Sequence, residues 1–113
     1  MKTDVLSSVW SSLPNAALIL DPKNFVVSVN PMAEQFINIS ERIIKGNNIE
    51  ENLFFNFSLS ETLIKVRTSN SKVIMDSVKV TLSNYSVFDC NIQFSPIIDF
   101  FNYVLIILDV RDI

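Results

Sequence analysis

The sequence predicts an α+β domain: a five-stranded antiparallel sheet with short helices on one face and an N-terminal amphipathic helix. Two observations support this prediction. Apolar residues have a helical period over residues 59–66 and a period of two from residue 78 onward. In addition, "VSVNPMAEQF" at residues 27–36 passes from an alternating run to a helical pattern at one Asn-Pro corner. Such a change of period within one short chain favours a sheet and helices in the same domain.

The N-terminal helix is predicted over residues 1–14, and residues 15–113 form the main domain. Leu6, Trp10 and Leu13 fall at i, i+4 and i+7, so they share one face of this helix. Two interpretations of the face remain open. The helix packs on its own domain, or it forms the interface of a dimer.

A hairpin and a corner follow. Residues 16–20 and 25–29 are apolar runs of strand length joined by "DPKN", in which Pro and Asn suit a tight turn. Asn30 is then expected to cap a helix, and Pro31 occupies the first helical position, where no N–H is needed. We therefore interpret Asn30 and Pro31 as a structural corner that carries the chain from the sheet onto its helical face.

The middle of the chain predicts short helices. One is expected to begin at Pro31, with Ala33, Phe36 and Ile37 on one face. A second is expected over residues 41–45, ended by Gly46, the only glycine. Residues 47–57 are interpreted as irregular. "SLSE" at residues 58–61 has the pattern of a capping box and opens a longer helix.

The last third predicts three strands, over residues 77–82, 85–94 and 103–110. The first two alternate apolar with polar residues, so one of their faces meets water. The third, like residues 16–20, is apolar on both sides, which is typical of a central strand. The N-terminal helix, from the same chain or a partner, is the expected cover for the second face.

Composition excludes several functional classes. The chain has no histidine and a single cysteine, which argues against His-based catalytic triads, zinc clusters and internal disulfides. Its net charge is −3, and its nine basic residues are scattered, which argues against nucleic-acid binding. No apolar run approaches the roughly 18 residues of a membrane helix. Without an apolar signal core at the N-terminus, the expected location is the cytoplasm.

The stretch "LPNAALILDPKNFVVSVNPMAEQFINIS" resembles the opening of a PAS domain, with Asn30, Pro31, Ala33 and Glu34 on its Asn-Pro-x-Ala-Glu motif. More narrowly, it is similar to the N-terminal PAS domain of the nitrogen-regulation sensor histidine kinases of the NtrB family. "FDCNIQFSPI" and "YVLIILDVRDI" fit the last two strands of that family. The resemblance spans almost the whole chain.

The resemblance implies a regulatory domain that pairs protomers and relays a signal to a C-terminal kinase core. The chain itself is then not an enzyme. It has no obligate cofactor, although an unknown small ligand is conceivable. The implied partners are a second copy and, through the full-length kinase, a PII-type signal protein and a response regulator. Arg111, Asp112 and Ile113 would begin the Asp-Ile-Thr motif that precedes the output helix. The alternatives are a small-molecule-binding PAS sensor of another signalling protein, a stand-alone structural dimer and a small enzyme.

Two sets of residues are candidate sites. An ordinary core, or alternatively a small-molecule cavity between helices and sheet, would be lined by Phe54, Phe55, Phe57, Phe88, Cys90 and Ile92. A dimer interface would use Leu6, Trp10, Leu13, Phe100 and Phe101. The cysteine is expected to be buried and unreactive, because its strand spacing places it on the apolar face.

Overall fold

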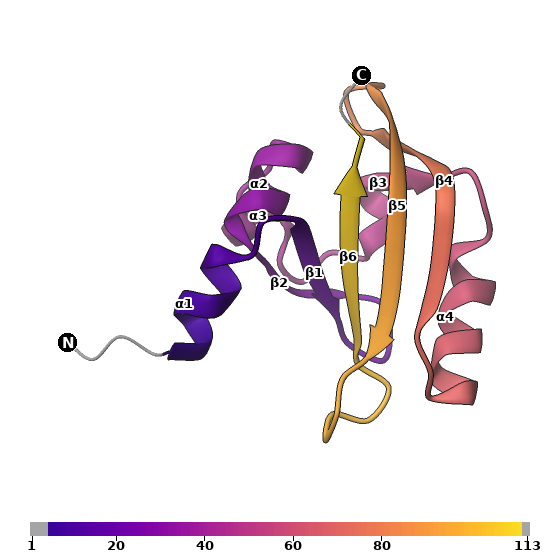
Figure 1. Ribbon diagram of the computed structural model, residues 1–113. Helices are drawn as coiled ribbons and strands as arrows, with labels where there is room; N and C mark the ends of the chain where they lie inside the picture. The colour runs from indigo at the N-terminus through magenta and orange to yellow at the C-terminus, as the bar shows by residue number, and fades with distance from the viewer. Residues whose placement is uncertain (1–4, 112–113) are drawn as a thin grey trace.

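The computed structural model describes residues 5–111 and shows a curled antiparallel sheet with helices packed on one face (Figure 1). The sheet has six strands in the order β2-β1-β6-β5-β4-β3. The strands are β1 Ala16–Leu20, β2 Val26–Val29, β3 Leu53–Phe55, β4 Val73–Leu82, β5 Val87–Pro96 and β6 Val104–Val110. The helices are α1 Val5–Ser12, α2 Pro31–Ile37, α3 Glu41–Ile44 and α4 Leu59–Ser69, with a 3₁₀ turn, η1, at Ile49–Glu51.

The prediction of five strands is wrong by one. Leu53 pairs with Leu82 and Phe55 pairs with Val80, so this segment forms a short edge strand beside β4. We predicted an irregular segment here because three residues are too few to display a period of two.

Strand β4 also begins earlier than predicted. Its pairing with β5 shifts between Met75 and Val78, and Ser77 has a φ of 54° at this irregularity. An extra residue at a bulge interrupts the alternation of a strand. The sequence pattern therefore indicated only the part of β4 that follows the bulge.

The core lies between the helices and the sheet, as predicted. The apolar face of α4 buries Leu59, Leu63 and Val66, and the alternating residues of the last strands are also buried. These strand residues are Val78, Val80, Leu82, Cys90, Ile92, Phe94, Val104, Ile106 and Leu108. Gly46 has a φ of 88°, the left-handed conformation expected where a helix ends.

Helix α1 projects beyond the sheet on the side of β2, rather than lying across the sheet face that the other helices leave open (Figure 1). None of its residues is buried. On that open face Ile19, Leu105 and Ile107 remain half-buried. Cover by this chain's own helix is therefore wrong, and cover by the helix of a partner stays a prediction. No helix in residues 5–111 has the length and apolar character needed to cross a membrane.

Candidate functional site

The Asn30 corner joins the sheet to the helical layer. The Asn30 side chain is fully buried, and its Oδ1 accepts hydrogen bonds from the N–H groups of Ala33 and Ala17, both at 2.9 Å. Its Nδ2 donates to the carbonyl of Asn15 at 2.9 Å. The predicted cap at the start of α2 is confirmed. The bonds to Ala17 and Asn15 were not predicted, and they make this amide a junction between β1, β2 and α2.

A chain of hydrogen bonds, Trp10–Ser28–Glu41–Glu34, links α1 to the rest of the domain. The Trp10 indole N–H donates to Ser28 Oγ at 3.1 Å, and the Ser28 hydroxyl donates to Glu41 Oε2 at 2.9 Å. Glu41 Oε2 also accepts from the Val29 N–H at 3.0 Å, and Glu34 Oε2 accepts from the Glu41 N–H at 2.7 Å. The chain thus connects α1, β2, α3 and α2 through polar groups shielded in part from water.

The predicted dimer face of α1 is divided between two environments. Trp10 and Leu13 are half-buried, and Trp10 bonds to the domain, whereas Val5, Leu6 and Val9 are 72%, 76% and 54% exposed. Around them lies a shallow groove of about 470 Å³, lined by Val5, Val9 and Leu13 together with Ser8 and Ser12. The helix therefore presents apolar side chains to solvent while its indole anchors it.

The predicted cavity residues are mostly packed into the interior. Phe57 lies between Phe55 and Phe94, with ring centroids 5.4 and 6.3 Å apart, and Phe88 packs edge-to-face on Phe36 at 5.1 Å. Cys90 and Ile92 are buried in the core. Their contacts are those of a packed core.

Phe54 does not face the interior as predicted. Its side chain is 52% exposed. Successive residues of a strand point to opposite faces, so the pairing of Leu53 and Phe55 with the buried side of β4 turns Phe54 outward.

Cys90 is shielded from solvent. Burial, with smaller contributions from the carboxylates of Asp89 and Asp109, raises the pKa of its thiol from 9.0 to about 11. The neutral thiol is therefore the form that the folded state favours.

This pKa predicts a loss of stability at alkaline pH. A folded-state pKa above the unfolded value contributes stability that is intact below pH 9 and is lost as the pH rises toward 11. The urea midpoint of the chain should fall over this interval more steeply than that of a Cys90→Ala variant, measured by circular dichroism. Parallel pH profiles for the two proteins would contradict the prediction.

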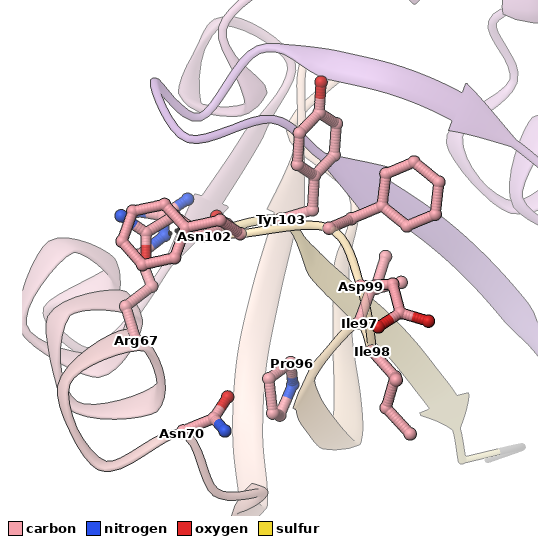
Figure 2. Close-up of a pocket in the computed structure, with 10 residues that line it drawn as sticks. Arg67, Asn70, Pro96, Ile97, Ile98, Asp99, Asn102 and Tyr103 are labelled. Carbon is pink, nitrogen blue, oxygen red and sulfur yellow. Dashed lines mark hydrogen bonds between the residues drawn. The ribbon is translucent and has the colours of Figure 1, made fainter.

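A second depression lies at the end of the sheet where a loop joins β5 to β6. Figure 2 shows this pocket, of about 690 Å³, between the C-terminal end of α4 and the loop residues 96–103. Ile98 and Phe101 are 86% and 85% exposed, and Phe100 packs edge-to-face on Tyr103 with centroids 5.8 Å apart. In Figure 1 this loop lies at the lower end of β5 and β6, whereas α1 lies at the left, beyond β2. The two halves of the predicted dimer interface are therefore separate surfaces.

One long side chain fixes the wall of this pocket. Arg67, in the last turn of α4, donates from Nε to the Asn102 carbonyl at 2.9 Å and from Nη2 to the Asp21 carbonyl at 3.0 Å. Burial lowers the pKa of its guanidinium, and the nearby Asp21 carboxylate opposes that shift. Sequence reasoning missed Arg67, because its partners are 35 and 46 residues away along the chain.

Of the predicted output motif, residues 111–113, the structure describes only Arg111. The Arg111 N–H donates to the Asp89 carbonyl at 2.9 Å, and its Nη2 donates to Asn91 Oδ1 at 3.1 Å. Asp112 and Ile113 lie outside the described residues. Within residues 5–111, no three His, Cys, Asp or Glu side chains are grouped to hold a metal ion.

Comparison with known proteins gives sequence and structural relatives. No family model matches the chain. A 105-residue match covers 93% of the chain and is 36% identical to the sensory histidine kinase/phosphatase NtrB of Rhodobacter capsulatus. The chain spans 30% of the length of that relative.

Solved structures show the same fold. The PAS domain of nitrogen regulation protein NR(II) from Vibrio parahaemolyticus has a TM-score of 0.80 and 18% identity, over 96% of this chain and 100% of that one. The PAS domain of an HTR-like protein from Haloarcula marismortui gives 0.76 and 14%, over 94% and 88%. A LOV domain of a blue-light activated histidine kinase from Erythrobacter litoralis gives 0.72 and 18%, over 89% and 99%. The chain therefore has the fold of a PAS domain, with a sequence similar to part of the histidine kinase NtrB.

Proposed function

We propose that the chain is the regulatory PAS domain of a two-component sensor histidine kinase in nitrogen control. In this proposal it pairs protomers through α1 and relays a conformational bias to a kinase core elsewhere in the polypeptide. The observation that carries the proposal is α1 itself: an apolar helix exposed to solvent yet anchored to the domain through Trp10. The similarity to NtrB supports the assignment to a histidine kinase.

The binding partner that best fits the groove on α1 is the same helix of a second copy of the chain. The segment Val5–Ser12, "VLSSVWSS", carries no charge, so two copies meet without electrostatic repulsion. The small side chains of Ser8 and Ser12 border the groove beside Val5 and Val9. A two-fold contact uses the same patch on both partners, so Val5 and Val9 of each copy would face the groove of the other.

The hydrogen-bonded chain Trp10–Ser28–Glu41–Glu34 supplies a route for the signal. It connects the dimer helix to α2 and α3, on the helical face of the domain. A partner that displaces α3 would alter the acceptor of Ser28 and with it the anchor of Trp10. Two dimer packings that differ by a few kcal/mol would then be populated differently.

The wider setting follows from the NtrB resemblance. We place the full-length protein in the cytoplasm, with a response regulator and a PII-type signal protein as its partners. The phosphotransfer chemistry would be performed by other domains.

A charged residue in the groove of α1 should separate the protomers. Val9→Asp is expected to raise the dimer dissociation constant at least about tenfold, because each copy loses a buried valine and gains a desolvated carboxylate. Sedimentation equilibrium measures this directly. Ile64→Asp is the matched control, since Ile64 is 61% exposed on α4. Wild-type chains that stay monomeric at about 100 μM, or equal effects of both variants, would contradict the proposal.

The link between α1 and the domain can be followed through Trp10, the only tryptophan. Ser28→Ala removes the acceptor of its indole N–H. We expect a lower fluorescence anisotropy and stronger quenching by acrylamide, because the helix gains freedom to move. Ser28→Thr keeps the hydroxyl and should resemble the wild type. Unchanged quenching in Ser28→Ala would show that this bond does not restrain the helix.

A further inference from the structure

The pocket at the β5–β6 loop has the dimensions and lining of a small-molecule site. Its volume of about 690 Å³ lies within the roughly 300–1,000 Å³ of typical ligand pockets. Pro96, Ile97 and the paired rings of Phe100 and Tyr103 supply apolar surface. The site lies at the end of the sheet and is separate from the core between helices and sheet (Figures 1 and 2).

Arg67 gives this pocket a fixed positive charge. Its two hydrogen bonds go to the neutral backbone carbonyls of Asn102 and Asp21, which hold the guanidinium in place without neutralising it. Among residues 5–111 the one ion pair is Lys79–Asp89, so Arg67 has no carboxylate within salt-bridge distance there. A guanidinium has five N–H donors, which leaves donors for a ligand. Burial lowers the pKa of the guanidinium by more than the nearby Asp21 carboxylate raises it.

The charges of the lining favour a ligand with one negative charge over a ligand with two. Among residues 5–111, Arg67 is the only cation that lines the pocket, and Asp99 contributes a carboxylate to the same wall. A phosphate group carries more than one negative charge near pH 7 and would meet this carboxylate with one guanidinium to balance it. A carboxylate carries one charge and matches the planar fork of arginine.

We propose that this pocket binds a small organic monocarboxylate with a flat apolar body. Its carboxylate accepts hydrogen bonds from Arg67, and its apolar body packs against Phe100 and Tyr103. The proposal does not depend on dimerisation through α1, because the pocket lies away from that helix.

Benzoate is the probe that tests the site, titrated into the 113-residue chain and followed by amide chemical shifts. Shift changes should concentrate in residues 96–103 and the end of α4, with a Kd on the order of 1 mM. Arg67→Gln should weaken binding about tenfold, the loss of one charge-assisted hydrogen bond. Lys72→Gln makes the same change of net charge outside the pocket and should leave the Kd unchanged.

A second variant should have the opposite effect. Asp99→Asn removes the like charge from the pocket, and we expect binding about twofold tighter. Asn tolerates the left-handed backbone of this position, where φ is 70°, so the loop should keep its shape. Should Arg67→Gln fail to fold, Arg67→Lys together with Asp99→Asn decides the question. Arg67→Lys should weaken the binding of benzoate severalfold, because lysine keeps the positive charge but lacks the planar pair of donors of the guanidinium.

Three results would overturn the proposal. One is the absence of benzoate binding at about 10 mM, tenfold above the expected Kd. Another is inorganic phosphate binding as tightly as benzoate. The third is an affinity for benzoate that does not respond to the charge changes at Arg67 and Asp99.

Discussion

Asn30→Ala is expected to lower the free energy of unfolding by about 3 kcal/mol. Loss of the N-cap of α2 costs about 1 kcal/mol. The Ala17 N–H and the Asn15 carbonyl would each lose the partner that Asn30 supplies, at about 1 kcal/mol apiece. The side chain is fully buried, so water does not replace it readily. The expected fall in Tm is more than about 10 °C, measured by thermal unfolding.

Asn30→Asp distinguishes the role of Asn30 as the N-cap of α2 from its hydrogen bond to the Asn15 carbonyl. Aspartate is as good an N-cap as asparagine, but its second oxygen would face the Asn15 carbonyl in place of an N–H donor. We therefore expect a destabilisation that persists at neutral pH and shrinks when the carboxyl is protonated. A loss of only about 1 kcal/mol in Asn30→Ala, with a wild-type-like Asn30→Asp, would reduce Asn30 to a simple cap.

Glu41→Ala should be the second most disruptive change, at about 2 to 3 kcal/mol. Glu41 Oε2 accepts from both the Ser28 hydroxyl and the Val29 N–H. Val29 is buried, so its N–H loses a partner that water reaches poorly. The Ser28 hydroxyl then becomes free to turn away from Trp10. Denaturant unfolding measures the first effect, and quenching of Trp10 fluorescence measures the second.

The control for this prediction is Glu41→Gln. Its side-chain carbonyl still accepts from Ser28 and Val29, so most of the stability should return. Glu61→Ala, an exposed glutamate in the first turn of α4, tests the general effect of losing a carboxylate. If Glu61→Ala and Glu41→Ala destabilise equally, the chain Trp10–Ser28–Glu41–Glu34 has no special role.

Much of the fold could be predicted from the sequence because its evidence is local. The period of two over Val78–Leu82, the turn at "DPKN" and the Asn-Pro corner each involve residues close together in the chain. Strand β3 and the bulge at Ser77 could not be predicted in this way. A strand of three residues is too short to show a period of two, and an inserted residue interrupts it.

The functional groups were harder to predict because their partners are distant in sequence. Trp10 meets Ser28 across 18 residues, and Arg67 meets Asp21 across 46. No spacing rule connects such pairs before the chain is folded. One feature of the sequence did indicate the several hydrogen bonds of Asn30. The residue at this cap is an amide, whose side chain both donates and accepts, rather than a carboxylate, which only accepts.

Cross-linking between protomers through α1 tests the central claim most directly. A Val9→Cys variant should form a disulfide-linked dimer under mild oxidation, while the buried thiol of Cys90 stays unreactive at pH 8 because its pKa is about 11. An Ile64→Cys variant, exposed on α4, should link slowly or not at all. Fast linkage of Val9→Cys alone, lost when Leu13→Asp is added, is the result that we predict. Equal linkage of the two variants, or none, would contradict dimerisation through α1.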